Sequence, residues 1–390
     1  MQLLFRAGVH YAATCILIIA AVLMPHPAIA LCPVKIRQPK RSAEKSRVST
    51  CGLADEIAKA VIQKFRSITR CEDLLHQQVL AGIVAVGPMG LSNISFGVGN
   101  KFHPKGLKSD HALRDCHAEI LARRAFKLFL LRQLQILIDG GESDFFELNE
   151  SRTLVVKDNI QFALYISSCP CGNACIRRWG DSPKESMQTN LGPYEFPKDS
   201  PHPKFHAHAR HEGQLAVTFK GISSTLSCSD KILGWNVKGI QGTRLSSIFE
   251  EPLMLKAVVV GRKFVKKHAE RAFCCRLTAK GINKEVVRAV NHPVMMCTSV
   301  KLDESAFTNL VEDGNDAVFG SKAMWWMDGF DACETLDGET GTLLQGGSRS
   351  QLSRKHFNTL IDTLGVAPPS NDQFNLAIIL ETELNKLRQI

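Results

Sequence analysis

The chain has 390 residues, of which 44% are hydrophobic and 22% charged, which excludes a disordered or fibrous polypeptide and allows one large domain or two small ones. Its formal net charge of +10 and pI of about 9.0 are typical of proteins that bind polyanions, nucleic acid above all, although charge alone also fits a generically basic protein. The thirteen cysteines are odd in number and irregular in spacing, which excludes a regular disulfide scaffold and favours a reducing compartment.

The N-terminal segment points to a different compartment. An apolar run over residues 11–24 is followed by Ala28-Ile29-Ala30, which resembles a signal-peptidase cleavage site. We interpret residues 1–30 as a signal-like leader or a misassigned start, and residues 31–52 as a basic linker, with a nuclear address or nucleic-acid arm as the alternative. We therefore expect a nuclear or cytoplasmic protein without stable membrane association, and secretory targeting is the alternative.

From Leu53 onward, helical and strand patterns alternate. Leu53, Ile57, Val61 and Phe65 repeat at i, i+4 and predict an amphipathic helix. Helical patterns also run from about residue 117 into the 130s, over 266–276 and over 376–387. Short apolar runs predict strands over 79–86, 94–98, 161–166, 215–219, 256–260, 286–290 and 294–300. This alternation predicts an α/β fold of three layers, with a mixed sheet between helices.

Two short motifs carry the chemistry. Asp115-Cys116-His117-Ala118-Glu119 contains His-x-Glu, and Pro170-Cys171-Gly172 supplies a later Pro-Cys. In this order the two are typical of zinc deaminases that act on a nucleobase, whereas either motif alone is a weak signal. The signature expects a second cysteine at position 174, where this chain has alanine, so the third zinc ligand must come from elsewhere.

The residue types suit hydrolytic deamination. A zinc ion with three protein ligands keeps a position for water and lowers the pKa of that water. His117 is a candidate ligand, and Glu119, two residues on at a helix start, is a candidate proton shuttle. We expect Cys171 to lie in a turn that opens a helix, where a thiolate is favoured. The residues alone leave Cys169, Cys175 and Cys228 open as the third ligand.

At this point a family resemblance is clear. The segments DCHAEIL, PCG, SCSDKIL, WNV and GIQG resemble, in this order, the adenosine deaminases acting on RNA and the related tRNA-specific adenosine deaminases. The resemblance extends from about Leu53 to about Leu364, and later segments such as WWMDGFDACETLDGETGT are more similar to the double-stranded-RNA editors. It implies a cytidine-deaminase-like zinc core with editase extensions over residues 53–390.

The resemblance also implies an activity and a site. The activity is zinc-dependent hydrolytic deamination of adenosine to inosine in RNA. Zinc would be held by His117, Cys171 and Cys228, which resolves the third ligand, and Glu119 would move protons. Asn100 and Lys101 match a strand-end pair that contacts RNA near the target base in relatives.

A buried inositol hexakisphosphate is a further implication of the resemblance. A polyphosphate inside a domain needs several cationic partners, because unpaired buried charge is very costly. Without the resemblance, the neighbouring arginines on the predicted helix would be read as solvated side chains. The positions that match or adjoin the family's phosphate pocket are Asp115, Arg123, Arg124, Lys231, Trp235, Gln241 and Lys355.

The chain departs from the family pattern in three places. The interval between Gln214 and Cys228 is short and contains no match to the loop whose glutamate replaces the extruded adenosine in duplex editors. Gly234 stands where relatives usually have arginine, and Arg114 stands where they usually have asparagine. The segment 375–390 matches the family's lysine- and tyrosine-rich helix poorly. We therefore expect a partly degenerate phosphate pocket.

These departures leave two alternatives to an RNA editor. One is a catalytically weak or inactive editase homologue that binds RNA and regulates editing. The other is an adenosine deaminase that acts on tRNA or on free nucleosides, because an adenosine that is unpaired leaves no gap in a duplex to be filled. Since no double-stranded-RNA-binding domain fits before Leu53, we expect affinity for RNA from the editase surface or from an RNA-binding protein partner.

Overall fold

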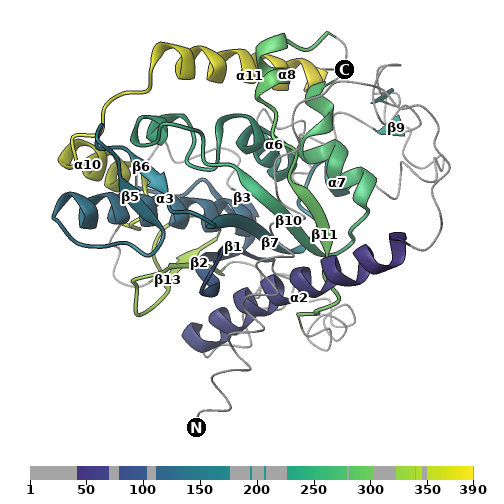
Figure 1. Ribbon diagram of the computed structural model, residues 1–390, viewed down its shortest axis with the longest axis horizontal. Helices are drawn as coiled ribbons and strands as arrows, with labels where there is room; N and C mark the ends of the chain where they lie inside the picture. The colour runs from purple at the N-terminus through teal and green to yellow at the C-terminus, as the bar shows by residue number, and fades with distance from the viewer. Residues whose placement is uncertain are drawn as a thin grey trace.

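The computed structural model describes ten stretches of the chain (Figure 1), which are residues 42–69, 79–102, 111–175, 194–195, 206–207, 226–278, 281–302, 322–338, 340–344 and 349–389. The leader over 1–30, the predicted strand over 215–219 and most of the short interval before Cys228 lie outside these residues. None of the helices in the described stretches is long and apolar enough to cross a membrane.

A seven-stranded mixed sheet forms the centre of the fold. Its strand order is β11-β10-β7-β1-β2-β12-β13, with β7, β10 and β11 parallel to one another and the other neighbours antiparallel. The strands are β1 Leu80–Gly87, β2 Gly90–Val98, β7 Gln161–Ser168, β10 Leu255–Arg262, β11 Val294–Cys297, β12 Lys322–Met327 and β13 Glu334–Asp337.

Helices cover both faces of this sheet. On one face lies α2, Ser42–Thr69, which begins inside the predicted linker (Figure 1). On the other face lie α3 Ala118–Ile138, α6 Cys228–Lys238, α7 Lys266–Phe273 and α8 Lys284–Ala289. The side chains of β7 alternate, since Phe162 and Leu164 join the core under α3 while Ala163 and Tyr165 join the core under α2. The predicted three-layer α/β architecture is therefore confirmed.

Shorter elements complete the domain. Two-stranded ladders join β3 Asn100–Phe102 to β4 Asp115–His117, β5 Phe146–Leu148 to β6 Leu154–Val156, and β8 Tyr194–Glu195 to β9 His206–Ala207. The short 3-10 segments are η2 Asn173–Cys175, η4 Thr243–Ile248, which is kinked at Leu245, and η5 Cys275–Thr278. The C-terminal helices are α10 Arg354–Thr363 and α11 Asn371–Gln389, and α11 packs on α6, α8 and η4.

One strand predicted from the sequence is wrong. Residues 286–290 were expected to be extended because Val286 and Val287 are β-branched, but they lie mainly in α8. Asn283 caps this helix by accepting a hydrogen bond from the Glu285 amide, and Val286 is its one buried residue. A helix cap and a single buried position therefore outweigh the local strand preference.

The predicted helix over 266–276 is shorter than expected. The α-helix ends at Phe273, and Cys274 adopts φ −148° and ψ −54° before the chain continues as η5. The predicted strand over 294–300 likewise ends at Cys297.

Contact between α3 and β2 sets the position of the first turn of α3. A Cβ atom added to Gly97 would lie 2.5 Å from the Ala118 carbonyl oxygen and 2.6 Å from the Ala122 amide nitrogen. Only glycine therefore lets the helix start approach the strand this closely. This contact fixes His117 and Glu119, the residues of the His-x-Glu motif, against the sheet.

Candidate metal centre and its surroundings

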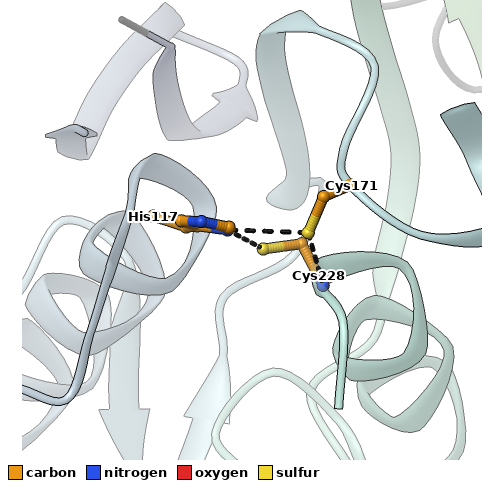
Figure 2. A group of neighbouring side chains, drawn as sticks. All are labelled: His117, Cys171 and Cys228. Carbon is orange, nitrogen blue, oxygen red and sulfur yellow. Dashed lines mark hydrogen bonds between the residues drawn. The ribbon is translucent and has the colours of Figure 1, made fainter. Parts of the chain in front are cut away.

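Three side chains from distant parts of the sequence converge at one point (Figure 2). The Nδ1 atom of His117 lies 2.9 Å from Sγ of Cys228 and 3.6 Å from Sγ of Cys171. All three ligand atoms lie within 4.8 Å of one another. We refer to His117, Cys171 and Cys228 as the metal centre. Among the candidates that the residues alone left open, the structure brings Cys228 to this point.

Each ligand stands at the end of a regular element. His117 ends β4 and is the N-cap residue of α3. Cys171 follows the buried strand β7, and Cys228 is the first residue of α6. Ser227 and Asp230 form a reciprocal capping box at the start of α6, which fixes the backbone on both sides of Cys228.

The start of α6 also holds the Cys171 loop. The amide and hydroxyl groups of Ser229 donate to the Cys171 carbonyl oxygen at 3.0 and 2.8 Å, and the Cys228 amide donates to Cys171 Sγ at 3.4 Å. The hydrogen bond with Cys228 and the neighbouring His117 hold the pKa of the Cys171 thiol well below its ordinary value, although burial opposes this. Within the residues that the structure describes, Cys171 is followed by the 3-10 turn η2, and α6 supplies a helix N-terminus beside the Cys171 thiol.

Two nearby cysteines point elsewhere. Cys169 Sγ donates to the Ala174 carbonyl at 3.2 Å, and Cys116 Sγ donates to the Leu113 carbonyl at 3.6 Å. Burial raises the pKa of Cys116 to about 12, so this thiol stays protonated at neutral pH. Both therefore serve as neighbours of the metal centre.

Glu119 lies in the first turn of α3, and only 3% of its surface is exposed. Burial raises the pKa of this carboxyl to about 7. A carboxyl with a pKa in this range both takes and gives protons near neutral pH, which is the property that a proton shuttle needs.

Two buried arginines, which the sequence reasoning missed, hold the segments that carry the cysteine ligands. Arg271 donates from Nε to Asn173 Oδ1 and from one terminal nitrogen to the Asn173 carbonyl at 2.7 Å, close to Cys171. Arg276 pairs with Asp230 of the α6 capping box at 2.7 Å, and both side chains are at most 2% exposed. No local sequence signal marks either arginine, because each acts through a partner that is distant in the chain.

Asp115 links the metal centre to its surroundings. Its carboxylate accepts the His117 amide at 3.0 Å and forms an ion pair with Lys231. Although burial opposes it, Lys231 holds the pKa of Asp115 below its ordinary value. Both predicted residues therefore lie beside the metal centre.

Further along α3, cations from three elements lie near one another. We name this group the cation cluster, and it consists of Arg123, Arg124, Lys127, Lys238 and Arg244. Burial and Arg124 lower the pKa of Arg123 to about 9. Burial, Arg123 and Arg124 hold the pKa of Lys127 well below its ordinary value, with further contributions from Arg244 and Lys238. None of the salt bridges within the described part of the chain involves these five side chains.

The sequence reasoning found two members of the cation cluster and missed three. Arg123 donates to the Ile240 carbonyl at 2.8 Å and lies over the Trp235 ring at 4.9 Å. Lys127 could have been found, because it is four residues from Arg123 on the same helix face. Lys238 and Arg244 approach from α6 and η4, which only the fold reveals.

Three further positions considered for the phosphate pocket lie in different surroundings. The Gln241 amide is buried and bonded at both ends, donating to the Lys238 carbonyl and accepting from the Leu253 amide at 3.0 Å each. Lys355 is exposed on α10. A Cβ atom on Gly234 would meet Leu380 and Leu384 of α11 at 3.8 and 3.9 Å, so α11 covers this position.

The predicted RNA-contact pair lies beside the metal centre. In the β3–β4 ladder, Asn100 is the register partner of His117, and Lys101 is the partner of Cys116. Both residues are partly exposed. The structure thus places this strand end next to a metal ligand.

The donor set of the metal centre fits zinc. Two thiols and one imidazole are the ligand types that zinc takes, and three protein ligands leave the open position that is typical of catalytic sites. A further group of possible ligands, Cys274, Cys275 and His292, lies elsewhere in the domain.

Comparison with known proteins agrees with the motifs. The adenosine-deaminase (editase) domain family matches residues 95–370. Double-stranded RNA-specific adenosine deaminase of Mus musculus is 33% identical over 82% of this chain and 29% of its own length. Double-stranded RNA-specific editase B2 of Mus musculus is 30% identical over 81% of this chain and 43% of its own length.

A third relative belongs to the tRNA branch. The tRNA-specific adenosine deaminase 1 of Saccharomyces cerevisiae is 27% identical over 58% of this chain and 63% of its own length. This chain spans less than half the length of the two double-stranded RNA-specific relatives. The resemblance drawn from the motifs is confirmed, and the chain belongs to the adenosine-deaminase (editase) domain family.

Proposed function

We propose that this protein catalyses the hydrolytic deamination of adenosine to inosine in RNA. One observation carries the proposal. The buried carboxyl of Glu119 stands two residues from His117, which converges with Cys171 and Cys228 on a site that fits zinc. A protein that only binds RNA has no need of a buried proton carrier with a pKa near 7.

The residues of the site have separate roles in this reaction. His117, Cys171 and Cys228 would hold the zinc ion, which when bound supplies the Lewis acidity that makes water nucleophilic near neutral pH. Glu119 takes a proton from the attacking water and gives a proton to the departing amino group, which leaves as ammonia. Asp115 fixes the His117 backbone through its amide and is itself held by Lys231.

The cation cluster supports a polyphosphate cofactor. Arg123 and Arg124 lower the pKa of Lys127, and Arg123 lowers the pKa of Lys238, so a bound anion would relieve the repulsion between these side chains. Inositol hexakisphosphate, which the family resemblance implies, has the required charge. Arg123, Arg124 and Lys127 of α3 would bind it together with Lys238 and Arg244, and Gly234 contributes no charge.

The partner is RNA, and relatives named for double-stranded RNA and for tRNA leave its class open. Asn100 and Lys101 are the candidate contacts, because their strand pairs with the strand that ends at His117. An RNA-binding protein is a further possible partner. Eight cysteines with described side chains are thiols, which supports the proposal of a nuclear or cytoplasmic location.

The decisive experiment measures inosine formed from a matched duplex RNA and from a tRNA. The wild-type protein is expected to form inosine, and Glu119→Gln is expected to lower the rate by about 10²- to 10⁴-fold because it removes the proton shuttle. Zinc content is measured in parallel, since Glu119→Gln leaves all three ligands in place. Glu147→Gln, at an exposed carboxylate on β5, is the matched control and is expected to retain full activity.

The outcome also separates the alternatives. Inosine in tRNA but not in the duplex assigns the tRNA branch. A folded, zinc-loaded wild-type protein that binds RNA and forms no inosine in either substrate contradicts the proposal and supports a regulatory RNA-binding homologue. Equal activity of wild type and Glu119→Gln contradicts the assignment of the proton shuttle.

A further inference from the structure

Several strands end at the same edge of the sheet as the metal centre. β2, β7, β10 and β11 run in one direction, because β10 is parallel to β7 and β11 while β1 is antiparallel to β7 and β2 (Figure 1). Cys171 follows β7, and His117 pairs with Asn100, which comes just after β2. In the order β10-β7-β1-β2, the end of β10 is therefore the neighbour of the Cys171 loop.

The segment that joins β10 to α7 is strongly basic. Residues 262–267 read Arg-Lys-Phe-Val-Lys-Lys and contain no acidic residue. Lys263, Lys266 and Lys267 are exposed, and we name these three residues the lysine turn. Lys266 forms an i, i+4 ion pair with Glu270 at 3.7 Å. An exposed pair of this kind is weak, so Lys266 is still able to bind a second anion.

Hydrogen bonds on both sides of the lysine turn hold it beside the loop that carries Cys171. Before the turn, the Arg262 carbonyl accepts the Cys169 amide at 3.0 Å. After the turn, Arg271 of α7 donates to the Asn173 carbonyl at 2.7 Å. Cys171 lies midway between residues 169 and 173, so the lysine turn is fixed next to the metal centre.

The backbone of Lys263 adopts a conformation that glycine takes more easily. Its φ of 62° lies in the left-handed region, which costs energy for a residue with a Cβ atom. The turn from β10 into α7 needs this conformation but does not need a charged side chain. A lysine at this position therefore agrees with a role for its charge.

We propose that the lysine turn binds backbone phosphates of the RNA, on the side of the target adenosine opposite to Lys101. The inference rests on the proposed function, which puts the reacting base at the metal centre and Lys101 beside it. The ends of β10 and β2 are separated by three strand spacings of about 4.8 Å each, about 14 Å in all. An RNA strand that crosses the metal centre along this edge therefore meets cations on both sides. Lysine contacts to phosphate position RNA without reading its sequence.

The salt dependence of RNA binding tests the proposal. In the variant Lys263→Gly/Lys266→Gln/Lys267→Gln of the full chain, glycine suits the left-handed turn and glutamine suits the helix. Each phosphate contact adds about 0.9 to the slope of log Kd against log salt for a duplex and about 0.7 for a single strand. We expect the variant to lose about 2 to 3 from this slope with a matched duplex RNA or a tRNA. From about 50 to 200 mM salt, the Kd of wild type then rises about 20- to 40-fold more than the Kd of the variant.

Two further measurements locate the contact. The matched control Arg152→Gln/Lys284→Gln/Arg288→Gln removes three exposed cations from the β5–β6 turn and α8, and is expected to keep the wild-type slope. RNAs that end at the target adenosine on its 5′ or its 3′ side form a second arm. The difference between wild type and the lysine-turn variant is expected to disappear with one truncation and to persist with the other.

Four results would overturn the proposal: no RNA binding by wild type, an unchanged slope in the lysine-turn variant, an equal loss in the control, or a difference that survives both truncations. Inosine formation is measured separately. The variant is expected to raise the KM for RNA far more than it lowers kcat, and the reverse contradicts a role in binding. If no protein forms inosine, the proposed deamination fails, whereas the slopes still decide whether the lysine turn binds RNA.

Discussion

The metal centre and the cation cluster are opposite in charge and lie on the same helix. At its start, α3 carries His117 as N-cap and Glu119 in its first turn, facing two thiols. One turn later, Arg123 begins a group of five cations. Glu119, Arg123 and Lys127 are spaced four residues apart, so one helix face passes from the anionic site to the cationic one.

The difference lies in how each region is supported. The metal centre is enclosed by hydrogen bonds from the Ser227–Asp230 capping box, Ser229 and the buried arginines, so its geometry is set before an ion arrives. In the cation cluster, the side chains contact backbone carbonyls and aromatic rings, and none forms a salt bridge with another described residue. The first region is preorganised, whereas the second holds several cations for which we propose an anionic ligand.

The strongest test of the metal centre removes one of its ligands. We expect Cys228→Ser to weaken zinc binding at the metal centre by more than about 100-fold, because even the loss of a supporting hydrogen bond costs about 10- to 100-fold in affinity. Competition with a chromogenic chelator measures the affinity. Cys169→Ser, whose sulfur points to the Ala174 carbonyl, is the matched control and is expected to retain the ion. Equal losses in both variants would contradict the ligand assignment.

Removing the support tests whether the metal centre is preorganised. Arg276→Met leaves the Asp230 carboxylate buried without its guanidinium partner, and breaking a buried pair costs about 3–5 kcal/mol. We expect a loss of unfolding free energy of this size by denaturant titration, with zinc affinity at the metal centre lowered about 10- to 100-fold.

The double variant Arg276→Met/Asp230→Asn is the control that separates the effect of an unpaired buried charge from the loss of the Arg276 side chain. Because it removes both charges, we expect it to recover part of the lost stability. If Arg276→Met leaves zinc affinity unchanged despite the loss of stability, the pair stabilises the fold without orienting Cys228.

The sequence predicted the metal centre better than its support, for a physical reason. Zinc chemistry restricts residue types and spacing, so His117, Cys171 and Glu119 stand out in the sequence, and the longer motif around Cys228 completes the set. Arg271 and Arg276 act through contacts with Asn173 and Asp230 that are 98 and 46 residues away in the chain, and no local pattern marks such pairs.

The same contrast holds for the fold. The helix α3 was predicted from its apolar face, and the strands β1, β7 and β10 were predicted from their unbroken apolar runs. The segment of the short helix α8 was predicted as a strand because it contains two valines. It is a helix because the cap at Asn283 outweighs the preference of these valines for a strand. The cation cluster was found only in part, because Lys238 and Arg244 reach α3 from other elements.

The cation cluster itself is tested by removing one charge with and without a polyanion. Burial, with Arg123 and Arg124 as the nearest cations, holds the pKa of Lys127 well below its ordinary value, so its charged form destabilises the free protein below the unfolded-state pKa. We expect Lys127→Met to raise the Tm of the protein stripped of anions by about 2–4 °C, equivalent to about 1 kcal/mol. With inositol hexakisphosphate present, we expect wild type to have the higher Tm, because its additional charge gives it the larger stabilisation on binding the polyanion.

A reversal in the Tm order of wild type and Lys127→Met on adding the polyanion distinguishes a ligand site from a surface that is merely basic. Lys59→Met, at an exposed lysine on α2, is the matched control and is expected to leave both Tm values and the polyphosphate-induced shift unchanged. If Lys127→Met lowers Tm in the absence of polyanion, the lysine stem contributes packing over Phe357 that exceeds the cost of its charge. If inositol hexakisphosphate shifts neither protein, the cation cluster does not bind a polyphosphate.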